Sequence, residues 1–435
     1  MMDTIFALAT PPGRGAIAVI RMSGPDTNRA LDALGAGRPT PRLATLKALS
    51  HQGDRIDQAL VLRFVGPQSY TGEDSAELHL HGGRAIVEAA TAALIAIGIR
   101  PAEPGEFTRR AFQNGRMDLA QAEAVADLID AETQAQAHQA LGQLAGALSA
   151  TYAGFRRDLL QALALVEAEI DFPDEDVPDH LASNAGPILD RLLGDLDRAL
   201  ADGQRGERVR DGYRIVLIGE TNAGKSSLFN ALVEREAAIV TPVAGTTRDV
   251  LDAQLVIGGY AVTLSDTAGL RPTDDPVEAE GVRRAQVRAA EAELRLWVRA
   301  PGDPEGAAAD HAQPGDLVIL SKADRGLAAS VEGFESLAVS PLTGQGLSQL
   351  HDWIAARLAR DLAGSDFPAV TRERHRRRLS EARDAVAAAR SALSVGPEMA
   401  GDDLRRAAQA LARVTGAIDV EDVLGEVFST FCIGK

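Results

Sequence analysis

Cysteine and aromatic residues are both scarce in this chain. Its 435 residues include one cysteine, Cys432, and aromatic residues make up only 4%. A single thiol excludes a disulfide framework and is consistent with a reducing compartment. Hydrophobic residues nevertheless reach 45% and charged residues 25%, an ordinary composition for a soluble globular protein. Because the apolar part is mostly Ala, Leu, Val and Ile, the composition favours long packed helices.

Long hydrophobic runs and a surplus of basic residues are also missing. No apolar stretch approaches the roughly 20 residues that span a bilayer, and Met1–Arg14 lacks the basic segment and apolar core of a secretory signal. We therefore expect a cytoplasmic protein that does not bind membranes. The net charge is −17, whereas proteins that bind nucleic acid with their whole surface are usually basic. Any RNA is expected to bind through a local basic patch or a partner.

Changes in residue pattern divide the chain into four segments. Residues 1–118 contain strand-like stretches at 4–9, 16–22, 58–64 and 76–81 and a helical one near 84–97, which predicts a small α+β domain. Residues 119–210 and 366–435 share a helical pattern. Residues 211–365 alternate strands and helices, as in α/β domains with a mostly parallel sheet. The economical interpretation is one helical domain interrupted by an inserted α/β domain.

A glycine-rich motif in the inserted segment predicts a nucleotide site. Gly219–Ser226 fits G-x-x-x-x-G-K-S, with an apolar strand (Ile215–Ile218) before it and an amphipathic helix (Ser227–Val233) after it. Glycines let successive backbone N–H groups point at phosphate oxygens. Lys225 is expected to reach the β- and γ-phosphates, and the Ser226 hydroxyl to ligate Mg²⁺.

Later motifs complete the pattern of a guanine-nucleotide site. Asp266–Gly269 follows a strand, with its Asp placed to hold Mg²⁺ through water and its Gly amide placed to sense the γ-phosphate. A switch threonine at Thr246–Thr247 is expected to close over the metal. Lys322–Asp324 ends another strand, and a carboxylate there can accept both hydrogen bonds from guanine N1 and N2. Ser340 is expected to start the loop that contacts guanine O6. We therefore predict GTP hydrolysis.

Three positions depart from the usual guanine-nucleotide pattern. Ser321 stands where an Asn usually braces the glycine loop and guanine N7, and Pro341 follows Ser340 where Ala is usual. The shorter serine predicts weaker nucleotide affinity. Leu270 follows the Asp266–Gly269 motif where Ras-like GTPases place a water-orienting Gln. An aliphatic side chain cannot orient water, so the catalytic group must come from elsewhere, and Glu278 is the candidate. From its local sequence alone, a solvated residue of the acidic loop Asp274–Glu280 is the better interpretation of Glu278.

Further motifs extend over the rest of the chain. They are Ala9–Gly15, Ile20–Gly24, Tyr70–Asp74, Glu77–Gly83, Pro104–Phe112, Asn114–Leu119, Gln121–Val125 and Phe431–Lys435. Together with the nucleotide motifs they resemble the bacterial tRNA modification GTPase family MnmE, also called TrmE. The resemblance implies a multidomain α/β protein with an N-terminal α+β folate-binding-type domain, a helical domain from two segments, and an inserted Ras-like P-loop G domain.

The resemblance assigns two roles to the N-terminal domain. It implies homodimer formation and binding of 5-formyl- or methylene-tetrahydrofolate, the one-carbon donor. Arg21, Glu77, Arg116 and Lys435 match the folate-contacting positions, and Arg116 replaces a common lysine. Arg and Lys suit the folate carboxylates, and Glu suits the donor face of a pterin. Without the resemblance, these four residues would be interpreted as ordinary surface charges.

The resemblance also implies the overall reaction and its partners. Family members join the flavoprotein MnmG in a heterotetramer and add an aminomethyl-type group at carbon 5 of the wobble uridine of certain tRNAs, at position 34. K⁺ in the interface between two G domains then does the work of an arginine finger. The matching K⁺ ligands are Asn222, Thr241, Val243 and Thr246, and Glu278 matches the residue that orients the water.

The motifs and the resemblance together define the predicted nucleotide site. Catalysis is assigned to Glu278 and Lys225, and Mg²⁺ coordination to Ser226 and Thr247. The predicted GTP contacts are Asn222, Ala223, Gly224, Lys225, Ser226, Ser227, Thr241, Thr246, Thr247, Asp266, Thr267, Ala268, Gly269, Lys322, Asp324 and Ser340.

Other conspicuous residues receive weaker interpretations. Cys432 matches a family cysteine, but a small buried side chain explains a lone thiol equally well. His79 and His81 share one side of a strand, yet no third ligand lies nearby in the sequence, which argues against zinc. The basic run Arg372–Arg378 could meet tRNA or MnmG, although the pattern favours a solvated helix face.

Two other functions compete with tRNA modification. A ribosome-assembly GTPase switch would share the G domain but carry a second G domain or a basic RNA-binding module, and this chain has one P-loop and a net charge of −17. A scaffold whose nucleotide affinity has degraded through Ser321 is the third hypothesis. Tight GTP binding by the purified protein would exclude the scaffold.

Overall fold

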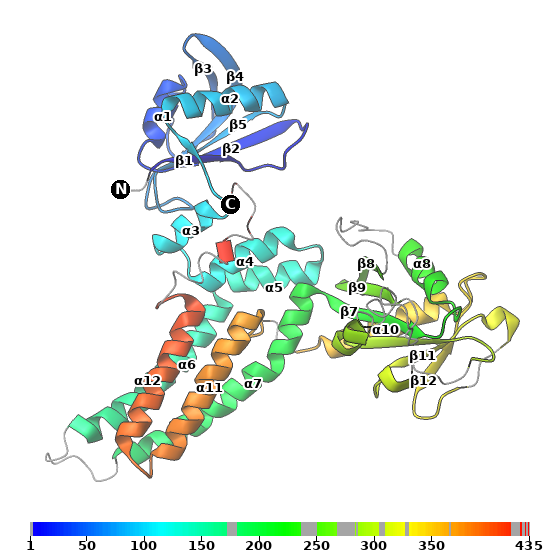
Figure 1. Cartoon of the computed structure of the whole chain (residues 1–435). Helices are drawn as coiled ribbons and strands as arrows, with labels where there is room; N and C mark the ends of the chain where they lie inside the picture. The colour runs from blue at the N-terminus through cyan, green and yellow to red at the C-terminus, as the bar shows by residue number, and fades with distance from the viewer. Residues whose placement is uncertain are drawn as a thin grey trace. The chain divides into compact units, whose positions relative to one another are not determined.

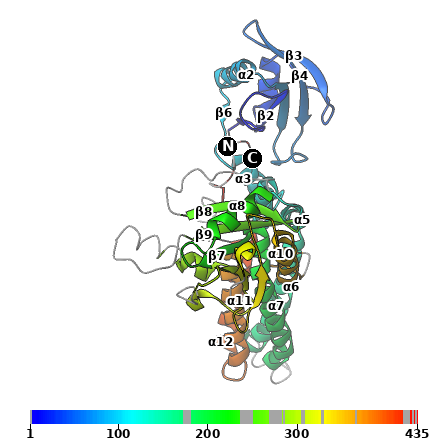
Figure 2. The ribbon, with the colours of Figure 1, turned by 90° about the vertical axis from the view of Figure 1, so that its right-hand side faces the viewer.

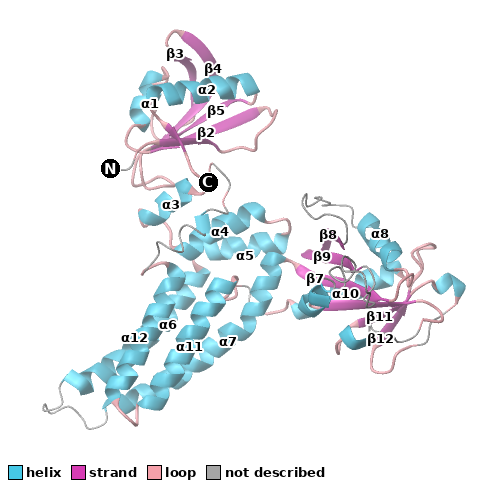
Figure 3. Ribbon diagram, viewed as in Figure 1, coloured by secondary structure: helices cyan, strands magenta, loops and turns pink. Residues whose placement is uncertain are grey.

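The computed structural model describes residues 3–171, 181–235, 250–267, 283, 286–303, 309–326, 330–364, 367–418, 427–428, 431 and 434. Residue contacts divide the chain into two compact units. One unit comprises Met1–Ala126, Gln143–Leu192 and Glu381–Lys435, and the other comprises Asp127–Gly142 and Leu193–Ser380. Figure 3 shows that each unit contains one sheet, drawn in magenta. Of the helices in these described parts, none has the length and apolarity that crossing a membrane requires.

The sheet of the first unit has six strands in the order β3-β4-β5-β2-β1-β6. Neighbouring strands are antiparallel except β1 and β6. Helix α2 packs on β4 and β5, and α1 packs on α2 (Figure 1). The elements are β1 (Ile5–Leu8), β2 (Ile17–Ser23), α1 (Thr27–Ala33), β3 (Thr45–His51), β4 (Asp54–Phe64), β5 (Ser75–His81), α2 (Arg84–Ile97), β6 (Arg100–Pro101) and α3 (Glu106–Gln113).

Alternating side chains give this sheet a covered and an open face. Ile20, Met22, Leu78 and Leu80 point to one side and are buried in the core with residues of α1 and α2. The predicted strands and the predicted helix over 84–97 are confirmed, with ends that shift by up to four residues. Strand β3 and helix α1 were not predicted, because neither segment has a strong hydrophobic periodicity or residues that mark its ends.

Long helices follow the sheet, as their continuous pattern predicts. Helix α6 packs along α12 and against the short 3₁₀ helix η1. Buried aliphatic residues and Tyr152 form the inner side of α6. The elements are α4 (Leu119–Asp130), α5 (Gln134–Leu144), α6 (Ala147–Asp171), η1 (Leu181–Ala185), α7 (Gly186–Asp211), α11 (Glu373–Ala392) and α12 (Pro397–Thr415).

The second unit contains the predicted α/β sheet. Its strand order is β12-β11-β10-β7-β9-β8, and all pairs are parallel except β8 with β9. Buried apolar residues cover both faces, as expected for a parallel sheet between helices. Figure 2 views the strands of this sheet from the side that faces right in Figure 1. The elements are β7 (Tyr213–Gly219), α8 (Lys225–Arg235), β8 (Val250–Ile257), β9 (Tyr260–Thr267), β10 (Leu294–Arg299), η2 (Ala309–His311), β11 (Leu317–Leu320), η3 (Ala323–Arg325), β12 (Glu335–Ala338) and α10 (Leu347–Asp361).

Parallel pairing brings the nucleotide motifs to one edge of this sheet. β7, β9 and β11 run in the same direction, so their carboxyl ends lie together. The glycine loop follows β7, Asp266 lies at the end of β9, and Ser321 directly follows β11. Ligands of open α/β sheets bind at this edge.

Candidate functional site

The loop between β7 and α8 requires glycine for steric reasons. Gly219 has φ +146°, and a Cβ added there would lie 2.2 Å from the carbonyl oxygen of Val298. Gly224 has φ +107°, and Asn222 adopts a left-handed conformation with φ 64°. Helix α8 then begins at Lys225. The predicted glycine-rich turn from strand to helix is therefore present. The N-terminus of α8 directly follows this turn, as phosphate-binding sites require.

Lys225 lies folded along this loop. Its Nζ donates hydrogen bonds to the carbonyl oxygens of Gly219 (2.9 Å) and Glu220 (3.0 Å), and the residue is only 7% exposed. Burial lowers the pKa of the ammonium group, although the carboxylates of Asp266 and Glu220 oppose this shift. A buried cation without a contacting carboxylate is a strong site for an anion, because the anion recovers the lost solvation.

Ser226 and Asp266 form the second half of the site. The Ser226 hydroxyl donates to Oδ2 of Asp266 at 2.6 Å. The other oxygen, Oδ1, is buried and has no hydrogen-bond partner within the described parts of the chain. Burial raises the pKa of Asp266, while the bond from Ser226 and the charge of Lys225 lower it. A hydroxyl beside a carboxylate with an unused oxygen is the hard oxygen donor set that Mg²⁺ prefers, so these residues fit the ion.

The residues after β11 brace the glycine loop from the other side. The Ser321 hydroxyl donates to the carbonyl oxygen of Ala223, and Nζ of Lys322 donates to that of Asn222 at 2.6 Å. The serine therefore makes a bond to the loop that the sequence analysis assigned to the usual asparagine. The weaker nucleotide affinity expected from Ser321 stays a prediction.

Asp324 and Ser340 meet at the predicted base end of the site. The hydroxyl of Ser340, which is fully buried, donates to Oδ1 of Asp324 at 2.6 Å. This bond lowers the pKa of the Asp324 carboxyl. The backbone N–H of Ser340 is held by the carbonyl oxygen of Gln345 at 2.9 Å. Ser340 thus orients an ionised carboxylate, which is the form that accepts hydrogen bonds from a guanine edge.

The structure describes only part of the predicted nucleotide site. It brings together Lys225, Ser226 and Asp266, and separately Asp324 and Ser340. Thr267 is described as the last residue of β9, without its side chain. Several predicted residues lie outside the described ranges, namely Thr241, Val243, Thr246, Thr247, Ala268, Gly269 and Glu278. Leu270 lies outside these ranges too.

Two of the predicted folate residues are paired on the N-terminal sheet. Arg21 of β2 lies opposite Glu77 of β5 and donates to its Oε1 from Nε (3.1 Å) and Nη2 (2.9 Å). The Arg21 guanidinium also lies over the rings of Tyr70 (5.4 Å) and Phe107 (6.0 Å). Both charged side chains stay partly exposed. Tyr70 and Phe107 were not predicted as site residues, although both lie inside the quoted motifs.

The histidines of β5 have carboxylate partners. His79 Nε2 lies 3.2 Å from Oε2 of Glu77, and His81 Nδ1 lies 2.8 Å from Oδ1 of Asp57. Among the described residues there is no group of three His, Cys, Asp or Glu side chains that could hold a metal ion. Arg116 packs against Gly72, whereas Lys435 and Cys432 lie outside the described ranges.

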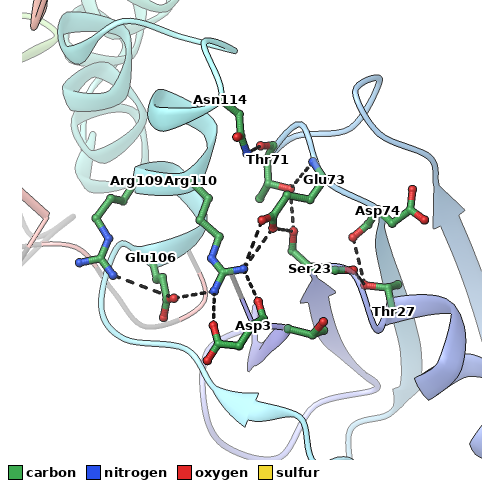
Figure 4. Close-up of polar contacts among 12 residues, drawn as sticks. Asp3, Ser23, Thr27, Thr71, Glu73, Asp74, Glu106, Arg109, Arg110 and Asn114 are labelled. Atoms are coloured by element: carbon green, nitrogen blue, oxygen red, sulfur yellow. Dashed lines mark hydrogen bonds and ion pairs between the residues drawn. The ribbon is translucent and has the colours of Figure 1, made fainter. Parts of the chain in front are cut away.

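A buried charge cluster fixes α3 to the N-terminal sheet (Figure 4). Arg110 is 3% exposed and donates to the backbone oxygen of Asp3 (2.6 Å), to Glu73 (3.2 Å) and to Glu106 (2.9 Å). Arg100 also bonds both Asp3 and Glu106. Hydrogen bonds from Arg100 lower the pKa of Asp3 to about 2. The pKa of Glu106 is also lowered to about 2, because bonds to Arg100, Arg110 and a backbone N–H outweigh the effect of burial.

Known protein families match nearly the whole chain. The model described as the TrmE N-terminus of GTP-binding proteins matches residues 4–116, and the model of the MnmE helical domain matches residues 119–432. The chain belongs to the MnmE family of tRNA modification GTPases. The resemblance drawn from the motifs is thereby confirmed, as is the fold class that it implied.

Relatives from several bacteria support this membership. The tRNA modification GTPases MnmE of Caulobacter vibrioides, Phenylobacterium zucineum and Maricaulis maris are 55%, 51% and 50% identical, and each alignment covers 100% of both chains. Among solved structures, the G domain of the T. maritima FeoB iron transporter is 22% identical with a TM-score of 0.28 over 34% of this chain and 98% of its own. Aquifex aeolicus Era bound to GDP and AlF₄⁻ is 24% identical with a TM-score of 0.27, over 33% of this chain and 56% of its own.

Proposed function

We propose that this MnmE-family chain is a K⁺-stimulated GTPase that, together with the flavoprotein MnmG, converts carbon 5 of the wobble uridine of certain tRNAs to an aminomethyl-type group. A tetrahydrofolate one-carbon unit supplies the carbon. The observation that carries the proposal is the pair of Ser226 and the buried Asp266 beside Lys225, in which one carboxylate oxygen lacks a hydrogen-bond partner among the described residues. Such an arrangement needs a bound cation and an anion to become fully satisfied.

GTP hydrolysis uses this arrangement as follows. Mg²⁺, when bound, offsets the negative charge that develops on the phosphates. Ser226 and Thr247 would ligate the ion, and Asp266 would hold it through water. Lys225 exchanges its bonds to loop carbonyls for bonds to the β- and γ-phosphate oxygens. Backbone N–H groups of the loop and the start of α8 provide the remaining phosphate contacts, through Asn222, Ala223, Gly224, Ser226 and Ser227.

Recognition of guanine rests on the base end of the site. Asp324 accepts hydrogen bonds from guanine N1 and N2, and its lowered pKa keeps the carboxylate ionised at neutral pH. Ser340 orients this carboxylate. Lys322 lies over the loop, where its aliphatic stem can cover one face of the base.

The K⁺ site and the water-orienting residue are carried over from the family. Asn222, Thr241, Val243 and Thr246 supply oxygen ligands to K⁺, and Glu278 orients the attacking water. The left-handed backbone of Asn222 supports this assignment, because the bond from Lys322 to its carbonyl oxygen holds the residue at one place in the loop. Thr267, Ala268 and Gly269 complete the nucleotide contacts beside Asp266.

The N-terminal domain is proposed to bind the folate. Glu77 accepts hydrogen bonds from the donor face of the pterin, and Arg21, Arg116 and Lys435 bind carboxylates. The contacts of Arg21 support this role, since the paired guanidinium lies over two aromatic rings and stays partly exposed. We propose domain limits of 1–118, 119–210, 211–365 and 366–435, with the second and fourth segments forming one helical domain.

The open face of the N-terminal sheet supports a homodimer. Ile17 of β2, Leu46 of β3 and Leu60 of β4 are 61%, 57% and 44% exposed and lie on the side opposite the core. Exposed aliphatic residues on one face of a sheet are typical of a protein contact. Two copies, two MnmG subunits and tRNA then form the working complex in the cytoplasm.

Mass spectrometry of tRNA nucleosides tests the proposal. A strain without this gene is complemented with the wild-type chain, with Lys225→Ala, or with Lys47→Ala as a control on β3. We expect the C5-modified uridine to be lost in the deletion strain and restored by the wild type and the control but not by Lys225→Ala. Unchanged wobble uridines in the deletion strain would contradict the proposal and would favour a ribosome-assembly switch.

A further inference from the structure

A cavity of about 640 Å³ lies where the N-terminal domain meets the helices of the same unit. Its walls come from the segment between α3 and α4, from the first half of α6 and from the end of α12. Lining residues include Arg116, Gln121, Arg156 and Thr415. None of the roles proposed above uses this cavity, apart from its border at Arg116.

The cavity is lined by two arginines and one carboxylate. Arg116 and Arg156 are both exposed, and neither forms an ion pair with another described residue. The acidic residue in the lining, Asp118, is occupied. Its Oδ1 accepts the backbone N–H of Gln121 at 2.9 Å, and its Oδ2 accepts the hydroxyl of Ser149. The cavity therefore offers net positive charge and fits a flexible molecule that carries several carboxylates.

Short contacts connect the cavity to the proposed folate residues. The Cγ of Arg116 lies 3.3 Å from the position that a Cβ on Gly72 would take. The side chain of Asn114 donates to the carbonyl oxygen of Thr71 at 2.7 Å. Two residues before Gly72, Tyr70 carries the Arg21 guanidinium over its ring. The loop Tyr70–Gly72 thus contacts Arg21 at one end and Arg116, which lines the cavity, at the other end.

We propose that this cavity binds the γ-linked polyglutamate tail of the folate, with Arg156 as a specificity-determining residue. The proposal rests on the folate site described above. Each added glutamate of such a tail contributes one carboxylate, and Arg116 and Arg156 are two cations that line the same cavity. Exposed arginine–carboxylate pairs are individually weak, so two of them strengthen binding about fivefold to tenfold at low salt.

Isothermal titration calorimetry of the full-length protein tests this proposal. The probes are the monoglutamate and the triglutamate of 5-formyl-tetrahydrofolate. We expect the wild type to bind the triglutamate about fivefold to tenfold more tightly, with the difference shrinking as salt is added. Arg156→Gln reduces the ratio of the two dissociation constants to about twofold to threefold, because Arg116 still lines the cavity, and Arg156→Lys keeps most of the preference.

Arg157→Gln is the matched control. Arg157 follows directly on α6, is 79% exposed, lies near Asp158 at 3.7 Å and does not line the cavity. This variant keeps the full preference for the triglutamate. Circular dichroism melting confirms that the three variants fold like the wild type.

The outcomes separate the tail site from the folate site. Equal affinity of the wild type for both folates overturns the tail proposal and leaves the folate site intact. A preference for the triglutamate that is as large in Arg156→Gln as in the wild type overturns it too. Failure of the wild type to bind either folate overturns the folate site, and the tail proposal with it.

Discussion

Two clusters of buried charge in this chain differ in how completely they are satisfied. Around Arg110, the carboxylates of Asp3, Glu73 and Glu106 surround the guanidinium, and Arg100 closes the cluster. The pKa values of Asp3 and Glu106 are lowered, so the fold favours the charged forms. At the nucleotide site the reverse holds, since burial lowers the pKa of Lys225 and raises that of Asp266.

This difference separates a structural cluster from a functional one. A cluster in which positive and negative groups pair with one another stabilises the fold and needs no ligand. Charges that the fold disfavours lower stability until a ligand of opposite charge binds, and active sites concentrate such groups. Substitutions in the two clusters are therefore expected to have opposite effects on stability.

The largest effect is expected from Arg110→Met. Removal of the guanidinium takes the ion-pair partner of Glu73 away and leaves Arg100 as the main partner of the buried Glu106, which costs about 3–5 kcal/mol of unfolding free energy. Denaturant unfolding of the wild type and the variant measures this change. Arg38→Met is the control, because Arg38 is 62% exposed and pairs with the exposed Asp32. Its expected cost is below about 1 kcal/mol, and equal losses for both variants would contradict the structural role of the cluster.

Asp266→Asn tests the charges of the nucleotide site in the same way. The neutral amide cannot offer a charged oxygen to Mg²⁺, and the rate of GTP hydrolysis is expected to fall by roughly 10²–10³-fold, the loss typical of one charge-stabilising group. Because burial disfavours the carboxylate, the melting temperature without nucleotide stays equal or rises. Steady-state GTPase assays and thermal melts measure the two effects. Asp252→Asn on β8, whose carboxylate bonds Ser265 and Arg288, serves as the control with near-normal hydrolysis.

The pH dependence of stability tests the N-terminal cluster through protonation of Glu106. Its pKa is depressed from 4.5 to about 2, so its contribution is complete above pH 4.5 and is lost as the pH falls to about 2. We expect this loss to be on the order of 2 kcal/mol. Unfolding free energies measured between pH 6 and pH 2 show a steeper decline in the wild type than in Glu106→Gln. Parallel curves for the two proteins would argue against a depressed pKa.

The smallest effect is expected at Ser321. Ser321→Ala removes the hydroxyl that holds the carbonyl oxygen of Ala223, and a buried carbonyl without its partner costs about 1–2 kcal/mol. The loop then has to be ordered by the nucleotide, so the affinity for GTP drops about tenfold. Fluorescent-nucleotide titration measures it, with Ser336→Ala on β12 as an exposed control. Unaltered affinity would show that Lys322 alone braces the loop.

Some features were predictable from local sequence and others were not. The glycine loop, the strand before it and the helix after it follow from spacing alone. The basic run Arg372–Arg378 shows the limit, since a solvated face was favoured there. Arg372 instead bonds Asp127 at 2.5 Å and His375 is buried, so that interpretation is wrong for these two residues. Asp127 lies 245 positions away from Arg372 in the sequence, and the hydrophobic periodicity of one segment cannot reveal such a partner.

By itself, the sequence determined the family, the kind of nucleotide and the elements that carry each motif, because these depend on short runs of residues with fixed spacing. Only the tertiary structure decided which charges are satisfied. Arg110 meets Asp3 across 107 positions, Ser321 reaches Ala223 across 98, and Asp266 keeps one oxygen without a partner in the described chain. Desolvation and hydrogen bonding act on groups that are close in space, so these properties arise only when the chain has folded.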